Sequence, residues 1–286
     1  MRKFLSLAFV AWAVVVTEGR PAQSAASAGP PYEVYAVRFA SVSYGESNLV
    51  LGGDPAHKID LAFTVWLVRG GGRTVLVDSG FYRDKFIQQW KPVTYVRPTE
   101  ALLNGLGVKP EDVTDIVISH SHWDHADGAD LFPKATVWIQ REEYAYYIGD
   151  AGERLHTGGV DPDDAKMFAA LKAAGRVKLV DGDDQEILPG IRVYTGGKHT
   201  YQSQYAGVQT RSGTVVLASD NAYLYLNIEK HLAIAQTASK EDVPSNLAAQ
   251  ERMLKLAAKP SLVIPGHDPA VFERFPVVKA GVVRID

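Results

Sequence analysis

Four side chains that can bind a metal ion occur within six positions of the chain: His120, His122, Asp124 and His125. They follow the apolar, β-branched run 113–119, which predicts a strand buried on both faces. Side chains two positions apart share one face, so His120 and His122 point the same way where this strand ends. Neutral imidazole and carboxylate groups bind Zn²⁺ and similar divalent metals. Packing these groups together without a cation would be costly, so the cluster predicts a metal site.

Each of three later candidate ligands lies at the end of a predicted strand or in the loop after it. They are His199 after Ile191–Thr195, Asp220 after Thr214–Ser219 and His267 after Leu262–Ile264. Glycines at 196, 197 and 266 let the backbone turn sharply beside a crowded site. Taken singly, Asp220 would be interpreted as a helix cap and His267 as a loop residue. The repeated pattern instead predicts that these strand ends meet at one edge of a sheet.

The composition limits the chemistry that this site can use. None of the 286 residues is cysteine, which excludes disulfides, thiolate ligands and a cysteine nucleophile. Hydrophobic residues make up 46% and charged residues 22% of the chain, which excludes an intrinsically disordered protein. The net charge of −3 provides no electrostatic footprint for nucleic acid, so no nucleic-acid partner is expected.

The N-terminus has the pattern of a secretory signal peptide, predicted at residues 1–28. Arg2 and Lys3 precede the 13-residue apolar run Phe4–Val16, and small residues end in Ala26–Ala28. An uncleaved N-terminal anchor is the alternative, but the run is short for a membrane-spanning helix. We therefore expect a secreted or periplasmic protein with no stable membrane anchor after cleavage.

The remaining residues, 29–286, are predicted to form one α/β domain in which runs of strands alternate with helices. Strands are predicted at Val34–Phe39, Leu61–Val68, Thr74–Val77, Val113–Ser119, Thr136–Ile139, Val177–Val180, Ile191–Thr195, Ala206–Thr210, Thr214–Ser219 and Leu262–Ile264. Helices are predicted at Thr99–Leu106, Arg141–Tyr147, Asp163–Ala174 and Ser245–Ala258, the last with Ser245 as its N-cap. This order indicates layered sheets covered by helices.

With these residues in place, the chain resembles the metallo-β-lactamase-fold hydrolase superfamily. Residues 120–125 match its H-x-H-x-D-H motif, and His199, Asp220 and His267 match its later ligand motifs. Asp78, in the segment 77–80, matches the early aspartate that usually lies behind the metal ligands. The resemblance implies a layered α/β (α+β) fold, the αββα metallo-β-lactamase sandwich, as a single domain with a dinuclear site at one edge.

The resemblance also implies which of the two metal ions each ligand binds. His120, His122 and His199 would bind one metal ion, Asp124, His125 and His267 a second, and Asp220 would bridge both. Two divalent ions are expected, with Zn²⁺ favoured and Mn, Fe, Co or Ni also compatible with such ligands. A metal-bridging hydroxide would attack the substrate, and Asp124 would relay a proton to the leaving group. Asp78 would orient a ligand imidazole.

Within the superfamily, the chain is most similar to the N-acyl-homoserine lactonase-like group. Tyr223 follows Asp220 by three residues, as in those lactonases, and is the candidate for oxyanion stabilisation, with simple packing as the alternative. Residues 264–269 also resemble this group. One departure is the segment 197–202, Gly-Lys-His-Thr-Tyr-Gln, where the group usually has Pro-Gly-His-Thr-Pro-Gly. Lys198 and Tyr201 therefore place a different surface beside His199.

The expected function is that of a metal-dependent hydrolase acting on ester bonds. The most favoured reaction is opening of N-acyl-homoserine lactones or related small-molecule lactones, a quorum-quenching activity. Trp123 and Tyr146 are candidates for the substrate pocket, although such aromatic residues more often serve core or helix-face packing. Hydrolysis of another carboxylic ester, a thioester or an organophosphate triester is the alternative. The bridging Asp220 disfavours a β-lactamase, and the complete ligand set disfavours a non-catalytic binding module. A homodimer is left open.

Overall fold

The computed structural model describes residues 31–153 and 159–286. The predicted signal peptide at residues 1–28 lies outside the described residues, so export of the protein stays a prediction. Within the described residues, no helix is long and apolar enough to cross a membrane.

The strands form two β-sheets. The strands of the larger sheet are β1 (Glu33–Gly45), β2 (Lys58–Gly70), β3 (Arg73–Val77), β4 (Thr94–Tyr95), β5 (Asp115–Val117), β6 (Thr136–Gln140), β7 (Val177–Val180), β13 (Val277–Lys279) and β14 (Val282–Arg284). Those of the smaller sheet are β8 (Gln185–Leu188), β9 (Ile191–Thr195), β10 (Gln204–Thr210), β11 (Gly213–Ser219) and β12 (Val263–Pro265). The nine-stranded sheet has the order β13-β14-β1-β2-β3-β5-β6-β7, with β4 paired to β1, and the five-stranded sheet has the order β12-β11-β10-β9-β8.

Strand direction brings particular chain segments to one edge of each sheet. β3, β5 and β6 are parallel neighbours in the larger sheet, with Val77 opposite Val117 and Val117 opposite Trp138. β11 and β12 are parallel in the smaller sheet, with Leu217 opposite Ile264. Because parallel strands end on the same side, the loops that follow each of these sets lie close together.

The alternation of side chains along β1 shows how the layers are held together. Val34 and Ala36 face the core between the two sheets, whereas Tyr35, Val37 and Phe39 face the opposite core. This two-residue period with both faces apolar is what a strand covered on both sides requires.

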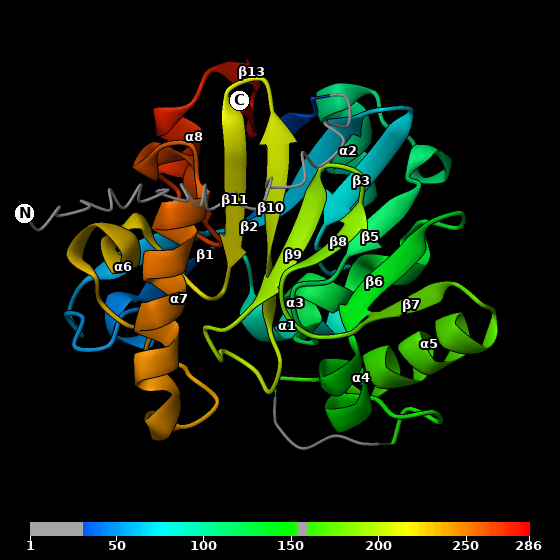
Figure 1. Cartoon of the computed structure of the whole chain (residues 1–286), viewed down its shortest axis with the longest axis horizontal. Helices are drawn as coiled ribbons and strands as arrows, with labels where there is room; N and C mark the ends of the chain where they lie inside the picture. The colour runs from blue at the N-terminus through cyan, green and yellow to red at the C-terminus, as the bar shows by residue number, and fades with distance from the viewer. Residues whose placement is uncertain (1–30, 154–158) are drawn as a thin grey trace, which may run out of the picture.

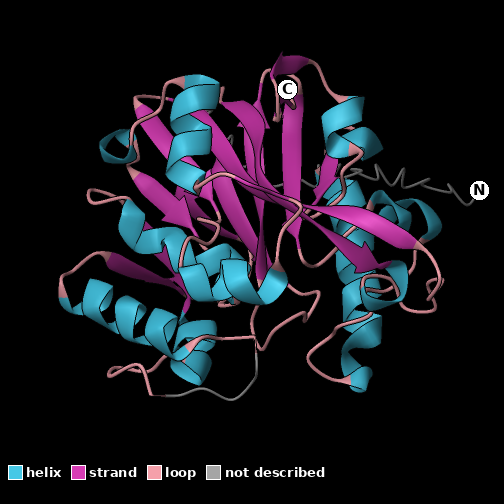
Figure 2. Ribbon diagram, turned by 180° about the vertical axis from the view of Figure 1, so that it is seen from behind, coloured by secondary structure: helices cyan, strands magenta, loops and turns pink. Residues whose placement is uncertain are grey.

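The helices cover the two outer faces of the paired sheets. They are α1 (Asp84–Trp90), α2 (Pro98–Leu106), α3 (Trp123–Ala126), α4 (Arg141–Tyr147), α5 (Pro162–Ala173), α6 (Tyr225–Lys230), α7 (Val243–Leu256) and α8 (Val271–Arg274), with short 3-10 turns η1 (Glu46–Asn48), η2 (Pro110–Asp112), η3 (Asp127–Leu131), η4 (Lys240–Asp242) and η5 (Pro260–Leu262). Helices α1 to α5 contribute side chains to the core outside the larger sheet, and α7 packs on the smaller sheet, to the left of β11 in Figure 1. The helices on the opposite side are visible in Figure 2. The predicted αββα sandwich is confirmed.

Most predicted elements are present, with two corrections. The strand predicted over 113–119 is only β5, because the chain leaves the sheet after Val117 and the Ser119 N–H donates to Asp78 instead. The predicted N-cap Ser245 is wrong: α7 begins at Val243, and Ser245 lies inside its first turn. The 3-10 turn η4 runs directly into α7, and a proline in the first helical turn needs no hydrogen-bond partner for its nitrogen.

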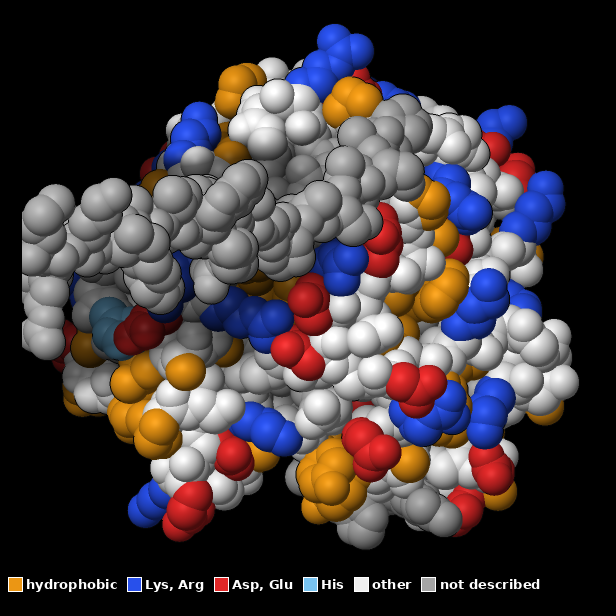
Figure 3. All heavy atoms as spheres, in the orientation of Figure 1, with side chains coloured by type: hydrophobic (Ala, Val, Ile, Leu, Met, Phe, Trp, Pro, Cys, Tyr) orange, Lys and Arg blue, Asp and Glu red, His pale blue; other side chains and the backbone are white. Residues whose placement is uncertain are grey.

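Several elements escaped the sequence patterns because they are short. Helices α1 and α6 have 7 and 6 residues, too few for a clear helical period. Strands β13 and β14 have 3 residues each, and all three residues of β13 are exposed at the sheet edge. Figure 3 shows Lys and Arg side chains interspersed with Asp and Glu on the face that carries α7.

Candidate metal centre

All seven predicted ligands lie together at one edge of the sandwich. His120 and His122 follow β5, Asp124 and His125 lie on α3, His199 follows β9, Asp220 follows β11, and His267 follows β12. The larger sheet thus supplies the 120–125 motif, and the smaller sheet supplies the other three residues. Each sheet contributes through loops at its strand ends, as the sequence predicted.

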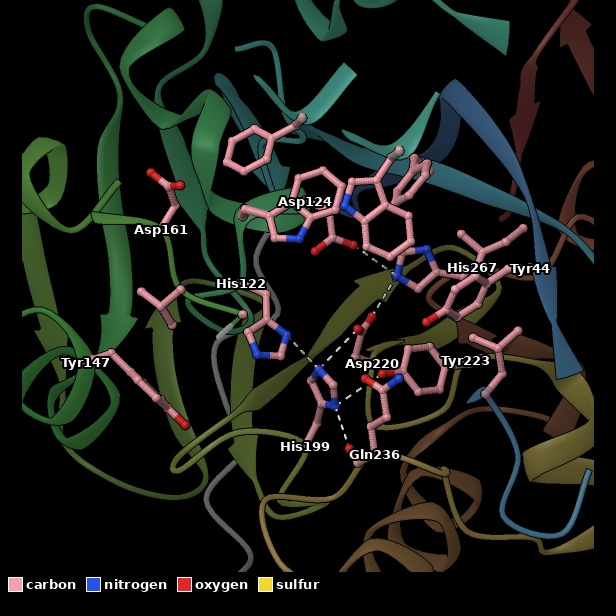
Figure 4. Close-up of a pocket in the computed structure, with 18 of the residues that line it drawn as sticks. Tyr44, His122, Asp124, Tyr147, Asp161, His199, Asp220, Tyr223, Gln236 and His267 are labelled. Carbon is pink, nitrogen blue, oxygen red and sulfur yellow. Dashed lines mark hydrogen bonds and ion pairs between the residues drawn. The ribbon is translucent and has the colours of Figure 1, made fainter. Parts of the chain in front are cut away.

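The ligand atoms fall into two groups, within each of which they lie no more than 4.8 Å apart. The first ligand group is His120, His122, His199 and Asp220, and the second ligand group is Asp124, His125 and His267. Figure 4 shows His122 and His199 facing each other, with Asp220 between His199 and His267.

Asp220 connects the two groups through its two oxygens. Its Oδ2 lies 3.3 Å from Nε2 of His199 and 3.7 Å from Nε2 of His120. Its Oδ1 lies 2.9 Å from Nε2 of His267 and 3.2 Å from Nε2 of His125. One carboxylate therefore faces imidazoles of both groups, the arrangement that a bridging ligand needs.

Hydrogen bonds on the outer side orient the rings. Nδ1 of His199 lies 2.8 Å from the carbonyl oxygen of Gln236, and Nδ1 of His267 lies 2.9 Å from that of Ala62. Because a carbonyl oxygen only accepts, both Nδ1 atoms carry the proton and both Nε2 lone pairs point into the site. His125 is held in the same way, with its Nδ1 2.8 Å from Oδ2 of Asp78.

The converging lone pairs fit a bound cation. Nε2 of His125 and Nε2 of His267 are only 3.3 Å apart, and the buried Nε2 of His120 has no hydrogen-bond partner among the described residues. Burial lowers the pKa of His125, but the charges of Asp220 and Asp124 outweigh it and raise that pKa well above its ordinary value. The second ligand group therefore favours positive charge, whereas burial lowers the pKa of the histidines of the first ligand group and keeps their nitrogen lone pairs free. The nitrogen and oxygen donors of both groups suit Zn²⁺ and related ions.

Asp78 lies behind the second ligand group, where the resemblance placed it. It sits in the left-handed region with φ of 60°, and its carboxylate accepts hydrogen bonds from the Ser119 N–H at 2.8 Å and from the Ser119 and Ser219 hydroxyls at 2.9 and 3.1 Å. This buried network orients the His125 imidazole. Ser119 and Ser219 were missed because serines at strand ends carry no distinguishing sequence signal.

Tyr223 lies beside the ligands with its hydroxyl 3.3 Å from Nδ1 of His199. Its ring packs against His199 and His267, with centroids 5.6 and 5.8 Å apart. Burial and the charge of Asp220 raise the pKa of Tyr223 well above its ordinary value, so the hydroxyl keeps its proton. Tyr223 can therefore act as a hydrogen-bond donor at the site.

A cavity of about 780 Å³ opens over the ligands and has an aromatic wall. The two predicted pocket residues, Trp123 and Tyr146, both line it. Trp123 stacks on Phe86 and Trp90 of α1, with ring centroids 4.6 and 5.3 Å apart. The contribution of α1 was missed, since that helix was not predicted. Tyr44, on β1, also lines the cavity and lies near Tyr223 in Figure 4.

Comparison with known proteins agrees with this geometry. The model of the metallo-beta-lactamase superfamily matches residues 62–267. An N-acyl homoserine lactonase from a Bacillus species is 26% identical over 227 residues, covering 75% of this chain and 84% of that enzyme. An N-acyl homoserine lactonase from Bacillus cereus is 31% identical over 169 residues, covering 58% of this chain and 60% of that enzyme.

A solved structure of a quorum-quenching N-acyl homoserine lactone lactonase superposes with a TM-score of 0.70 at 22% identity. The match covers 86% of this chain and 95% of the lactonase, which establishes the shared fold. The family match spans most of the chain and encloses every candidate ligand. The chain therefore belongs to the metallo-β-lactamase superfamily and is a metal-dependent hydrolase.

Proposed function

We propose that the enzyme opens the ring of N-acyl-homoserine lactones or closely related neutral lactones, using two divalent metal ions. The observation that carries the proposal is the position of Asp220, whose two oxygens each face imidazoles of a different ligand group. The N-acyl homoserine lactonases among its relatives support the choice of substrate.

The first ligand group would hold one ion and the second ligand group the other, with Asp220 shared between them. Bound there, the ions would supply an activated water and polarise the substrate carbonyl. Tyr223 would donate its hydroxyl proton in a hydrogen bond to the carbonyl oxygen as negative charge develops on it. Asp124, whose Oδ2 lies 3.3 Å from Nε2 of His125, would accept the proton that the attacking water gives up and pass it to the departing alkoxide.

The cavity lining supports a neutral substrate. Its described lining residues include no Lys or Arg. A substrate with a free carboxylate, such as a β-lactam, would therefore find no cationic side chain there. An acyl chain would instead contact aromatic residues such as Trp123 and Trp90.

The test is a substrate panel on purified protein whose metal content is measured by mass spectrometry. N-hexanoyl homoserine lactone, a phenyl ester and an organophosphate triester would be followed, the lactone by proton release. We expect fastest turnover of the lactone, loss of turnover after chelation, and recovery on addition of Zn²⁺. The variant Asp220→Ala should lose turnover. Protein holding two ions that leaves the lactone intact would contradict the proposal, and preferred turnover of the triester would assign the alternative activity.

A further inference from the structure

One buried carboxylate near the ligands belongs to neither ligand group. Glu143 lies on α4, on the core side of the helix, and is 0% exposed. Among the described residues, no Lys or Arg forms an ion pair with it. Surface carboxylates such as Asp181 and Asp150, by contrast, pair with Arg141 and Lys172. A buried carboxylate without a cationic partner is costly and calls for a specific reason.

Glu143 is satisfied by the backbones of two ligand loops. Its Oε1 accepts a hydrogen bond from the Ser121 N–H at 3.0 Å, and its Oε2 accepts one from the Gln202 N–H at 2.8 Å. Ser121 stands between His120 and His122 in the sequence, and Gln202 lies three residues after His199. A single side chain therefore joins the loop from the larger sheet to the loop from the smaller sheet.

Tyr147, one helical turn further along α4, holds the second loop from the same side. Its hydroxyl accepts a hydrogen bond from the Tyr201 N–H at 3.1 Å. Tyr146 stacks on the ring of Tyr201, with centroids 4.1 Å apart and planes at 1°. The hydrogen bond uses the Tyr201 N–H, which a proline at this position would lack. In this chain, α4 restrains the loop through contacts that a proline could not make.

The two loops that α4 joins carry the imidazoles that meet most closely in the first ligand group. Nδ1 of His122 lies 3.0 Å from Nε2 of His199. Burial raises the pKa of Glu143, while the N–H groups of Gln202 and Ser121 oppose that rise by stabilising the carboxylate. Residues that orient metal ligands commonly change metal affinity 10- to 100-fold when they are replaced.

We infer that Glu143 is a positioning residue that sets the spacing of His122 and His199, and through it the metal affinity of the first ligand group. Tyr147 supports the same spacing, because its hydroxyl holds the backbone of the loop that carries His199. The inference rests on the metal centre of the proposed function, and it goes further by assigning a role to a residue that touches neither metal nor substrate.

The decisive variant is Glu143→Gln, with Glu142→Gln as the matched control. The glutamine amide can accept only one of the two N–H groups, because its NH2 would face the other. Glu142 is the adjacent residue of the same helix, but it is exposed. Metal-loaded proteins would be titrated with a chelator, and the ions retained per chain counted by mass spectrometry. We expect one of the two ions to leave Glu143→Gln at a chelator concentration at least about tenfold lower than the wild type requires. Retention of the other ion, and of both ions in Glu142→Gln, should match the wild type.

Two outcomes would overturn the inference. In the first, Glu143→Gln retains both ions as tightly as the wild type. In the second, it binds both ions equally more weakly, and its metal-free form also has a lower melting temperature than the metal-free wild type. The second outcome would mean that Glu143 only stabilises the fold. If Glu143→Gln does not fold, Tyr147→Phe is the second variant, because it removes only the hydroxyl that holds the Tyr201 N–H. This variant should retain the same ion less tightly than the wild type. Unchanged retention in Tyr147→Phe would also overturn the inference. A wild-type protein that binds no metal would instead contradict the proposed function.

Discussion

Hydrogen bonds to groups outside the ligand set decide how the individual histidines can act. His199 and His267 donate to backbone carbonyls, and His125 donates to Asp78, so each presents a lone pair to the site. The protein's own hydrogen bonds therefore orient the rings, which reduces the rearrangement that metal binding requires. The same preorganisation applies to Tyr223, whose ring is held between two of the ligand imidazoles.

Replacing Tyr223 by Phe would test its role as a hydrogen-bond donor. The phenyl ring would keep its packing against His199 and His267, while the only donor that it can aim at the substrate would be lost. We expect kcat for the lactone to fall about 100-fold with a much smaller change in KM, as for removal of one donor to an oxyanion. Steady-state kinetics of Tyr223→Phe and of the wild type would measure this change.

Tyr225→Phe is the matched control for that variant. The Tyr225 hydroxyl is buried, has no hydrogen-bond partner among the described residues and lies outside the cavity lining. Its removal should leave kcat unchanged. Wild-type kcat in Tyr223→Phe would show that the Tyr223 ring serves packing alone.

Among the secondary-structure elements, charged contacts connect the two segments that wall the cavity beside Trp123. Arg83, the N-cap residue of α1, forms an ion pair with the buried Asp127 and donates a hydrogen bond to the buried carboxyl of Asp164. Lys85 pairs with Asp161, the N-cap residue of α5, which also lines the cavity. The walls formed by α1 and by the start of α5 are therefore held to each other, and the shape of the cavity depends on this network.

The buried carboxyl of Asp164 should make stability depend on pH. Burial, with the nearby charge of Asp127 adding to it, raises the pKa of Asp164 to about 9. An unfolded Asp ionises near pH 4. The folded state therefore keeps a proton that the unfolded chain releases, so this residue favours folding at low pH and its contribution is lost progressively as the pH rises towards 9.

Asp164→Asn removes that titration. We expect its melting temperature to decline less than that of the wild type between pH 7 and pH 9, measured by circular dichroism. Asp163→Asn is the control, because Asp163 is the adjacent helix residue and its side chain is 59% exposed. A decline as steep in Asp164→Asn as in the wild type would contradict this prediction.

On the scale of the whole molecule, the proposed metal centre joins the two sheets. Its ligands come from loops of both sheets, and His267 also connects to β2 through the Ala62 carbonyl. A ligand that binds only the folded state stabilises it, by about 2.7 kcal/mol at a concentration 100 times its dissociation constant. Metal bound here should therefore stabilise the whole sandwich.

Removing the metal is expected to lower the melting temperature by roughly 5–10 °C, given about 2–4 °C per kcal/mol for a domain of this size. Differential scanning fluorimetry of metal-loaded protein with and without chelator would measure the shift. The Asp220→Ala variant, which lacks the bridging carboxylate, should respond less. An unchanged melting temperature in protein that has lost its metal would contradict this expectation.

The sequence by itself determined the fold class and the candidate ligands. Metal ligation demands particular side chains, and their placement after apolar strands makes His120, His199, Asp220 and His267 recognisable without any coordinates. The order of the predicted strands and helices likewise indicates layered sheets covered by helices, and the resemblance to the metallo-β-lactamase superfamily implies the αββα arrangement of those layers.

Only the tertiary structure decided what surrounds those ligands. The carbonyl of Ala62 stands 205 residues from His267, and Ser219 stands 141 residues from Asp78. Backbone atoms belong to every residue, and single serines or glutamates such as Glu143 occur throughout the chain, so no local pattern marks them. The cavity wall depends on α1, a helix too short to leave a period in the sequence. Contacts between distant segments exist only once the chain has packed, and they are what turn a set of ligands into a shaped site.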